Sequence, residues 1–296
     1  MKKRMLMLAT AAILVVFCGS LFAQTTSVGD TLMVGPLNSE GQPLGALNEA
    51  IHSDTTETGE RVHSVYKLQR GAQYILTESL QADFPLVIVA DAPDDDNRPP
   101  IIRCGLKADG SAVNHWWYIY DDATFKNLWI SGVNLDGTGP ISWIAQTVNT
   151  TGKTITYDGC IVEFPYTWWA TFNDAGGLND YIIKDCLFKN VGNPTGTTWN
   201  GAIFNNDGHD TVKVSNTTFY KFGCFAIKGP FHTEIDHCTF VESVVHPIDN
   251  HRHINRHYTN NLFVDVHAFS DDQDEIKRHF DQEVKGIMNY AEIQWD

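Results

Sequence analysis

The sequence has few of the residues that mark several common protein classes. Basic residues are scarce, because 21 Lys and Arg stand against 36 Asp and Glu and give a formal net charge of −15. An excess of that sign opposes non-specific binding to nucleic acid and to anionic membranes. Only 23 of the 296 residues are glycine, which excludes collagen, and 43% hydrophobic residues exclude intrinsic disorder. We therefore expect a folded, acidic protein with one large core.

Cysteine is too sparse and too irregularly spaced to indicate a disulfide framework or a zinc site. Of the six cysteines, Cys18 lies in the N-terminal apolar segment, and the other five form no CxxC pair. An odd number without such pairs gives little support for disulfides and none for a zinc ribbon. We expect unpaired thiols in the core, where free cysteine behaves as a small hydrophobe. The five are Cys104, Cys160, Cys186, Cys224 and Cys238.

Long apolar runs are absent after residue 23. Residues 2–4 are Lys-Lys-Arg, residues 5–19 are almost entirely apolar, and Ala23 is a small residue suited to cleavage. This pattern is typical of a bacterial secretory signal peptide, and the apolar run is shorter than the ~20 residues of a membrane span. We expect cleavage after Ala23, a secreted protein and no transmembrane span. Removal of the three basic residues takes the net charge from −15 to −18.

The sequence does contain an imperfect repeat, with steps of 21 to 31 residues between copies. Six segments alternate apolar and polar residues, as strands with one buried face do. Their central column consists of Val133, Cys160, Cys186, Thr217, Cys238 and Asn261. Two residues further on, the column consists of Leu135, Val162, Phe188, Phe219, Phe240 and Phe263.

Several copies contain a second short strand, as in Gly201–Phe204, Phe225–Lys228 and His246–Asp249. Two or three short strands per copy, without the helices and leucine framework of leucine-rich repeats, predict a parallel β-helix. Rungs of such a solenoid pair at about 4.8 Å, so that like side chains stack in ladders. The predicted fold class is therefore all-β, a parallel β-helix.

The ends of the chain carry two candidate capping segments. Leu47, Ala50 and Ile51 have helical spacing within residues 44–52, and a capping box at residues 270–273 precedes an amphipathic pattern. We expect a signal peptide over 1–23, an N-terminal extension with a capping helix over 24–64, the β-helix over 65–268, and a C-terminal helical cap or truncated segment over 269–296. Six rungs are few for this architecture, so a fragment that lacks C-terminal modules is one expectation.

Three motifs are similar to those of one known superfamily. They are the entry Leu47-Asn48-Glu49-Ala50-Ile51, the strand and turn over Val65–Tyr74, and the rung motif Asp185-Cys186-Leu187-Phe188-Lys189-Asn190. On these motifs residues 44–268 resemble the pectate-lyase-like right-handed β-helix superfamily. The resemblance implies a right-handed parallel β-helix. It does not select a function, because that fold carries lyases, hydrolases, epimerases, adhesins and phage tailspikes.

A cluster of histidine and arginine between residues 246 and 257 is the densest candidate site. A polysaccharide lyase needs a base and a cation that neutralises the substrate carboxylate, and such groups would gather in outward columns of the solenoid. The candidate catalytic residues are Lys228, His251, His253 and Arg256. The candidate substrate-binding residues are Lys213, Asp249, His257, Trp168 and Trp199. A solvated turn and a surface salt-bridge ladder are the alternative interpretations of the same residues.

The sequence thus predicts a secreted or cell-surface β-helix that binds an extracellular polysaccharide or cell-surface glycan. If the protein is an enzyme, we expect it to cleave that ligand. The first enzymatic choice is a polysaccharide lyase, and the second is a glycoside hydrolase, for which residues 206–210 give only a loose match. The alternative is a non-enzymatic structural or adhesive module. Calcium is the one candidate cofactor, at Asp94–Asp96 or Asp271–Asp274, although a solvated loop and a helix start explain both clusters. The sequence does not indicate an oligomeric state.

Overall fold

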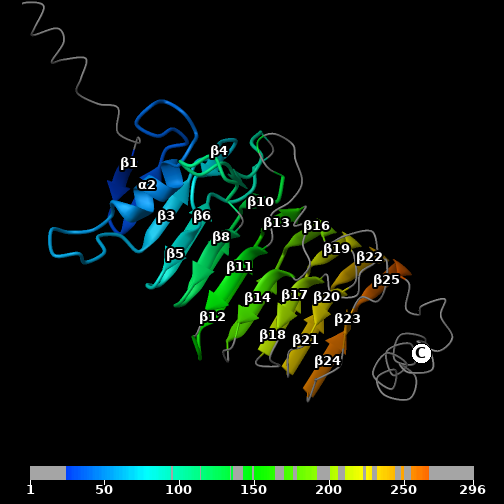
Figure 1. Ribbon diagram of the computed structural model, residues 1–296. Coiled ribbons are helices and arrows are strands. Elements are labelled where there is room, and N and C mark those ends of the chain that lie inside the picture. Colours follow the sequence, from blue (N-terminus) through cyan, green and yellow to red (C-terminus); the bar gives the residue numbers. More distant parts are fainter. Residues whose placement is uncertain are drawn as a thin grey trace, which may run out of the picture.

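The computed structural model describes most of the chain between residues 25 and 266 as short strands stacked in register (Figure 1). The described residues are 25–94, 96–113, 115–133, 135, 143–148, 150–163, 170–175, 179–191, 201–205, 211–222, 225–228, 232–243, 248–249 and 255–266. The predicted signal peptide and the predicted C-terminal helix lie outside them. Within them, three mostly parallel sheets run along one axis, which is the arrangement of a parallel β-solenoid.

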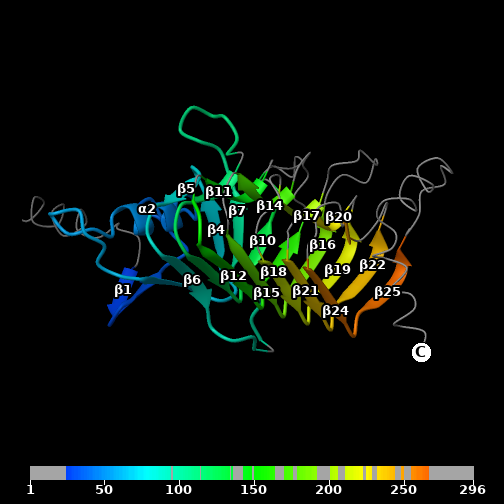
Figure 2. The ribbon, with the colours of Figure 1, turned by 90° about the horizontal axis from the view of Figure 1, so that it is seen from below.

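The first sheet has ten strands and contains the chain's only antiparallel pair of named strands among the described residues, β1 with β2. Figure 2 shows its later strands in a row. In spatial order the strands are β1 (Thr25–Val28), β2 (Thr31–Val34), β3 (Val65–Leu68), β6 (Leu86–Ala90), β9 (Ala123–Lys126), β12 (Thr154–Asp158), β15 (Asp180–Lys184), β18 (Thr211–Ser215), β21 (His232–Asp236) and β24 (Asn255–Thr259).

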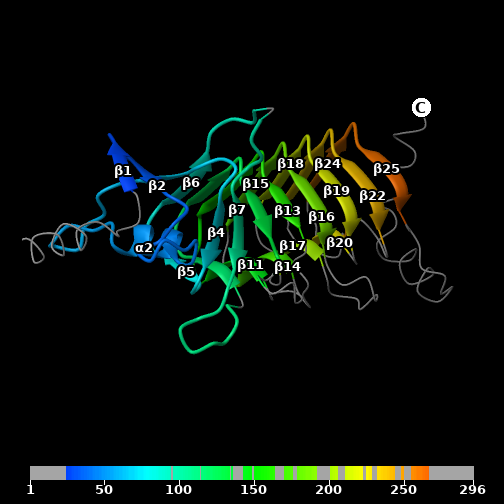
Figure 3. The ribbon, with the colours of Figure 1, turned by 90° about the horizontal axis from the view of Figure 1, so that it is seen from above.

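The second sheet has eight strands and is seen along its length in Figure 3. In spatial order they are β4 (Gln73–Leu76), β7 (Ile101–Cys104), β10 (Trp129–Ser131), β13 (Ile161–Glu163), β16 (Leu187–Val191), β19 (Thr218–Phe222), β22 (Thr239–Ser243) and β25 (Leu262–Val266).

The third sheet has seven strands and completes each copy of the repeat. In spatial order they are β5 (Leu80–Ala82), β8 (His115–Ile119), β11 (Trp143–Val148), β14 (Ala170–Ala175), β17 (Gly201–Asn205), β20 (Phe225–Lys228) and β23 (Ile248–Asp249).

A left-handed residue turns the chain from the ten-stranded to the eight-stranded sheet in each of six successive copies. This backbone favours glycine, asparagine and aspartate over other residues. At Gly159, φ is +64° and an added Cβ would lie 2.5 Å from Asn127 Oδ1, so a side chain there would have to displace that of Asn127. The six turn residues are Asn127, Gly159, Asp185, Asn216, His237 and Asn260.

In the last five of these six copies, the residue after the turn forms the ladder of small polar side chains predicted from the repeat. The backbone N–H of Cys160 donates to Cys186 Sγ at 3.4 Å, and that of Cys186 donates to Thr217 Oγ1 at 3.3 Å. The N–H of Cys238 donates to Asn261 Oδ1 at 2.9 Å. These buried donors would otherwise have no partner, which costs free energy. The column therefore needs a small side chain that also accepts a hydrogen bond.

The cysteines of this ladder and Cys104 are buried free thiols, which confirms the predicted core thiols for the four described residues. Cys224 lies outside the described residues. Burial raises the pKa of Cys238 to about 11, and the hydrogen bond with Cys160 followed by burial raises the pKa of Cys186 well above its ordinary value. Thiols with raised pKa values stay protonated and are poor nucleophiles.

Phenylalanine stacks on the inner side of the eight-stranded sheet, as the second repeat column predicts. Ring centroids lie 5.0 Å apart between Phe188 and Phe219, 5.0 Å between Phe219 and Phe240, and 4.9 Å between Phe240 and Phe263. The nearly parallel rings are spaced by the rungs themselves. This ladder and the β-branched residues of the ten-stranded sheet fill the core.

The first copy of the repeat is offset from its predicted position. The sequence alignment placed Val133 in the column of Cys160, but β10 pairs Trp129 with Ile161. This register places Leu128, which is fully buried, beside Cys160 instead. The prediction was wrong by five residues because the segment before Leu128 also alternates apolar and polar residues, and a sheet register depends on pairing that one strand does not reveal.

The one helix among the described residues, α2 (Ala46–His52), forms where the helical spacing predicted it. Its buried residues Leu47, Ala50 and Ile51 join the hydrophobic core, and the helix contacts β4 and β2. Strand β2 pairs in parallel with β3, so residues of the expected N-terminal extension belong to the ten-stranded sheet.

Candidate functional site

A depression of about 310 Å³ opens on the ten-stranded sheet, across the first halves of β18, β21 and β24. Polar and charged side chains from all three strands line it. The lining residues are Thr211, Lys213, His232, Thr233, Glu234, Asn255, Arg256 and His257.

Strand register explains how residues more than 20 positions apart meet here. Lys213 pairs with Glu234, and Glu234 pairs with His257, so these three form one column across successive rungs. Residues of this column are exposed and alternate with the buried Val214 and Ile235. Lys213, Glu234 and His257 therefore point outward in one column, as side chains at alternate positions of a strand do.

Positive charge predominates in the depression. Lys213 and Arg256 are cations, His232 and His257 are histidines, and Glu234 is the one acidic residue of the eight that line it. Lys213 Nζ lies 3.1 Å from Glu234 Oε1, with both side chains 51% exposed. A pair so exposed to water contributes little to stability, and a competing anion can replace its partner.

Carboxylates near the depression are occupied by other contacts. Asp236 Oδ1 accepts from Thr259 Oγ1 at 2.5 Å and from Asn260 Nδ2 at 3.1 Å, and Asp236 Oδ2 lies 2.8 Å from His237 Nδ1. These bonds, that to Thr259 most of all, lower the pKa of Asp236 to about 2. Asp180 Oδ1 accepts the backbone N–H of Thr211 at 3.2 Å.

The structure brings together three of the nine residues proposed from the sequence. Arg256, Lys213 and His257 line the depression. Lys228 and Asp249 lie opposite each other on β20 and β23, in the predicted register, and away from these three strands. The positions outside the described residues are His251, His253, Trp168 and Trp199.

Thr211 and Asn255 line the depression although neither was a candidate from the sequence. They flank His232 in one column, two positions before Lys213, Glu234 and His257, and Asn255 Nδ2 lies 3.1 Å from His232 Nδ1. Extending the repeat alignment by one position toward the N-terminus would have found this column.

The calcium prediction finds no support in the described part of the chain, where no three His, Cys, Asp or Glu side chains gather as a metal site would require. Asp94 Oδ1 instead accepts the backbone N–H groups of Asp96 and Asn97, and Asp94 Oδ2 lies 3.2 Å from Arg70 Nε. These contacts show that Asp94 stabilises its own loop. Asp95 and the acidic cluster at 271–274 lie outside the described residues.

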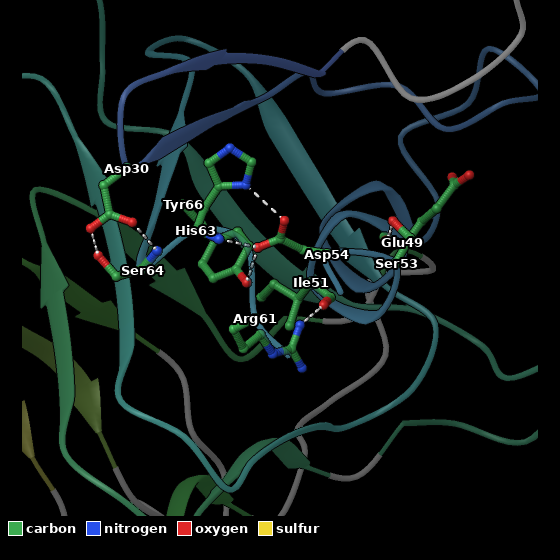
Figure 4. A network of polar contacts seen from close by, with 9 residues as sticks. All are labelled: Asp30, Glu49, Ile51, Ser53, Asp54, Arg61, His63, Ser64 and Tyr66. Carbon is green, nitrogen blue, oxygen red and sulfur yellow. Dashed lines mark hydrogen bonds and ion pairs between the residues drawn. The ribbon is translucent and has the colours of Figure 1, made fainter. Parts of the chain in front are cut away.

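A second cluster of polar side chains lies at the opposite end of the solenoid, around Asp54 (Figure 4). Its carboxylate lies 2.7 Å from His63 Nδ1 and accepts from the His63 backbone N–H at 3.1 Å and from Tyr66 OH at 2.8 Å. The Asp54 and His63 side chains are only 4% and 12% exposed. Arg61 donates to the carbonyl of Ile51. The cluster closes the loop between α2 and β3.

No protein-family model matches the sequence, and no curated protein matches it. Within the described residues, no helix has the length and hydrophobicity needed to cross a membrane.

Proposed function

We propose that the protein is a secreted polysaccharide-binding solenoid whose ligand is an acidic extracellular glycan. The observation that supports this proposal is the gathering of Lys213, His232, Arg256 and His257 in one depression of a protein with net charge −15. A local basic surface overcomes the unfavourable overall charge, because nearby charges act most strongly within a Debye length of about 8 Å at physiological salt.

The repeat supports a polymer as the ligand. The basic groups come from three successive rungs, and rungs are spaced at about 4.8 Å. Charges presented at such a spacing suit a chain that carries carboxylate or sulfate groups on successive sugars. The hydroxyl of Thr211 and the amide of Asn255 add polar groups of the kind that bind sugar hydroxyls.

Cleavage is the second part of the proposal. Lys213 and Arg256 would neutralise a uronate carboxylate, and His257 would accept the proton from the adjacent carbon, as a lyase requires. As the C–H bond and the glycosidic C–O bond break, one carbon–carbon double bond forms, and the oxygen of the leaving sugar takes a proton from water. A non-enzymatic binding module uses the same cations without this proton transfer.

We also propose a handedness and a superfamily for the solenoid. It is a right-handed β-helix of the pectate-lyase-like superfamily, capped by α2 at the start and by residues 269–296 at the end. Cleavage after Ala23 would export the chain to where extracellular glycans occur.

The proposal is tested with purified protein and a panel of polygalacturonate, alginate, sulfated dextran and neutral dextran. We expect the acidic polymers to bind, and Lys213→Ala with Arg256→Ala to weaken binding at least tenfold, about 1.4 kcal/mol. Lys107→Ala with Arg98→Ala, which likewise removes one exposed lysine and one exposed arginine, is the matched control. Equal binding by the Lys213 and Arg256 double variant would refute the site.

The same samples distinguish binding from cleavage. The ultraviolet absorbance of unsaturated uronate, lost in His257→Ala, would establish a lyase. Binding without new absorbance would leave a binding module, and no binding to any acidic polymer would favour the structural solenoid.

A further inference from the structure

A second group of donors lies on the outer face of the eight-stranded sheet, away from the depression. Ile102 and Ile130 are fully buried on β7 and β10 and point into the core. Arg103 and Trp129 alternate with them and therefore lie on the outer face. Trp129 pairs with Ile101, two positions before Arg103, so the two side chains are diagonal neighbours on adjacent strands.

Both side chains have a buried nitrogen without a partner. Among the described residues, neither Arg103 Nε nor Trp129 Nε1 has a hydrogen-bond partner. Arginine is a permanent cation, and a buried donor without an acceptor costs free energy, more so when it is charged. Native proteins keep few such groups, so each one needs an explanation.

The charged groups on the following rungs of this face pair with each other. Glu163, with its side chain only 8% exposed, pairs with Lys189 on the next rung, where Lys189 Nζ lies 2.9 Å from Glu163 Oε2. The same Lys189 Nζ lies 4.7 Å from the centre of the Trp129 ring. Arg103, Lys189 and Glu163 together carry one net positive charge.

We propose that Arg103 and Trp129 form an oxyanion-binding site, which takes a carboxylate or sulfate group. One oxygen accepts from Arg103 Nε and another from Trp129 Nε1, and the net positive charge of the face favours an anion over a neutral group. Lys189 covers the Trp129 ring, so the ring contributes its N–H and not a stacking surface for sugar. This site is independent of the depression on the ten-stranded sheet.

The test is thermal unfolding and calorimetric titration of the purified protein with sodium sulfate, sodium glucuronate, glucose and sodium chloride at matched ionic strength. The first two distinguish a free ion from an oxyanion carried on a sugar. We expect sulfate or glucuronate at about 100 times its Kd to raise the Tm by about 5 °C, and glucose to raise it by nothing. Failure of both anions to bind would overturn the proposal.

Three variants locate the effect. Arg103→Met should abolish the rise, and its ligand-free Tm should equal or exceed that of the wild type, because a buried unpaired charge is removed. Trp129→Phe keeps the ring, loses the N–H and should weaken binding about tenfold. Arg98→Met, at an exposed arginine, is the matched control.

A second Arg103 variant covers the case in which Arg103→Met does not fold. Arg103→Lys, which keeps the charge and lacks the Nε donor, replaces Arg103→Met if that variant does not fold. Wild-type affinity in either Arg103 variant would refute the site. Loss of binding in Lys213→Ala, with no loss in the Arg103 variants, would assign the anion to the depression instead.

Discussion

The Asp54 cluster and the depression between β18, β21 and β24 both bring histidine and carboxylate side chains together, at opposite ends of the solenoid. Asp54 is buried and accepts hydrogen bonds from His63 and Tyr66. Glu234 is half exposed and contacts Lys213. A buried carboxylate surrounded by donors has no capacity left for a ligand, whereas an exposed pair among excess cations can exchange partners. The two sites contain the same residue types. They differ in how deeply the carboxylate is buried and in how many of its hydrogen bonds are already made, and this difference distinguishes a structural cluster from a binding surface.

The largest expected effect is on the Asp54 side of this comparison. Asp54→Ala removes the acceptor of three hydrogen bonds and leaves buried donors unpaired, which should lower the free energy of unfolding by about 3 kcal/mol. Urea unfolding measures it. Asp54→Asn, which keeps one acceptor oxygen, should lose less, and polysaccharide affinity should be unchanged in both. An unaltered urea midpoint for Asp54→Ala would show that the cluster is not structural.

A change at Glu234 should alter the free energy of polysaccharide binding by about 1 kcal/mol. Glu234→Gln keeps the size of the side chain and removes the one acidic charge among the lining residues, so affinity for an acidic polysaccharide should rise about fivefold. Titration at low salt measures this rise, and added salt should reduce it. Glu60→Gln, at an exposed glutamate near the other end, is the control. An equal rise in both variants would indicate a net-charge effect with no role for the depression.

A smaller effect is expected for the Lys213–Glu234 pair on stability. The two side chains are each 51% exposed, so a double-mutant cycle on unfolding should give a coupling of no more than about 0.5 kcal/mol. Chemical unfolding of the wild type, both single variants and the double variant gives the coupling. A coupling several times larger would make the pair structural, like the Asp54 cluster.

The smallest expected effect is on how the stability of the folded protein depends on pH. The pKa of Asp236 is lowered to about 2 by hydrogen bonds, so its ionised form stabilises the folded state. That contribution is present above pH ~4, the ordinary range of the group, and is lost as pH falls from there through about 2. Thr259→Val removes the strongest bond and should raise this pKa, moving the loss to higher pH. An NMR titration of Asp236 measures the shift, and identical titration curves would contradict the assigned cause.

Sequence reasoning succeeded where the repeat makes contacts between equivalent positions. The Cys160, Cys186 and Thr217 column and the phenylalanine column follow from period and alternation alone, and both ladders form. It missed the offset of the first copy at Leu128, because two adjacent segments alternate equally well. It also gave no indication that the ladder side chains accept the turn N–H groups of neighbouring rungs.

Sites outside the repeat were harder to predict. Asp54, His63 and Tyr66 follow no period, and they meet because the loop after α2 folds back onto β3. Trp129 lies in the copy whose alignment was wrong, and Arg103 lies one rung earlier, outside the alignment, so their proximity was not visible from the sequence. In the depression, Lys213, Glu234 and His257 were found because they share one repeat column, whereas the column of Thr211, His232 and Asn255 was not extended far enough.

The sequence alone determined the β-solenoid class and the identity of the inward ladders, because these depend on alternation and period, which are local properties. The tertiary structure decided the register of the first copy, the partners of each carboxylate and the gathering of Lys213, Glu234, Arg256 and His257 in one depression. Those features depend on which strands pair and on what water can reach, and both are settled only when distant segments pack together.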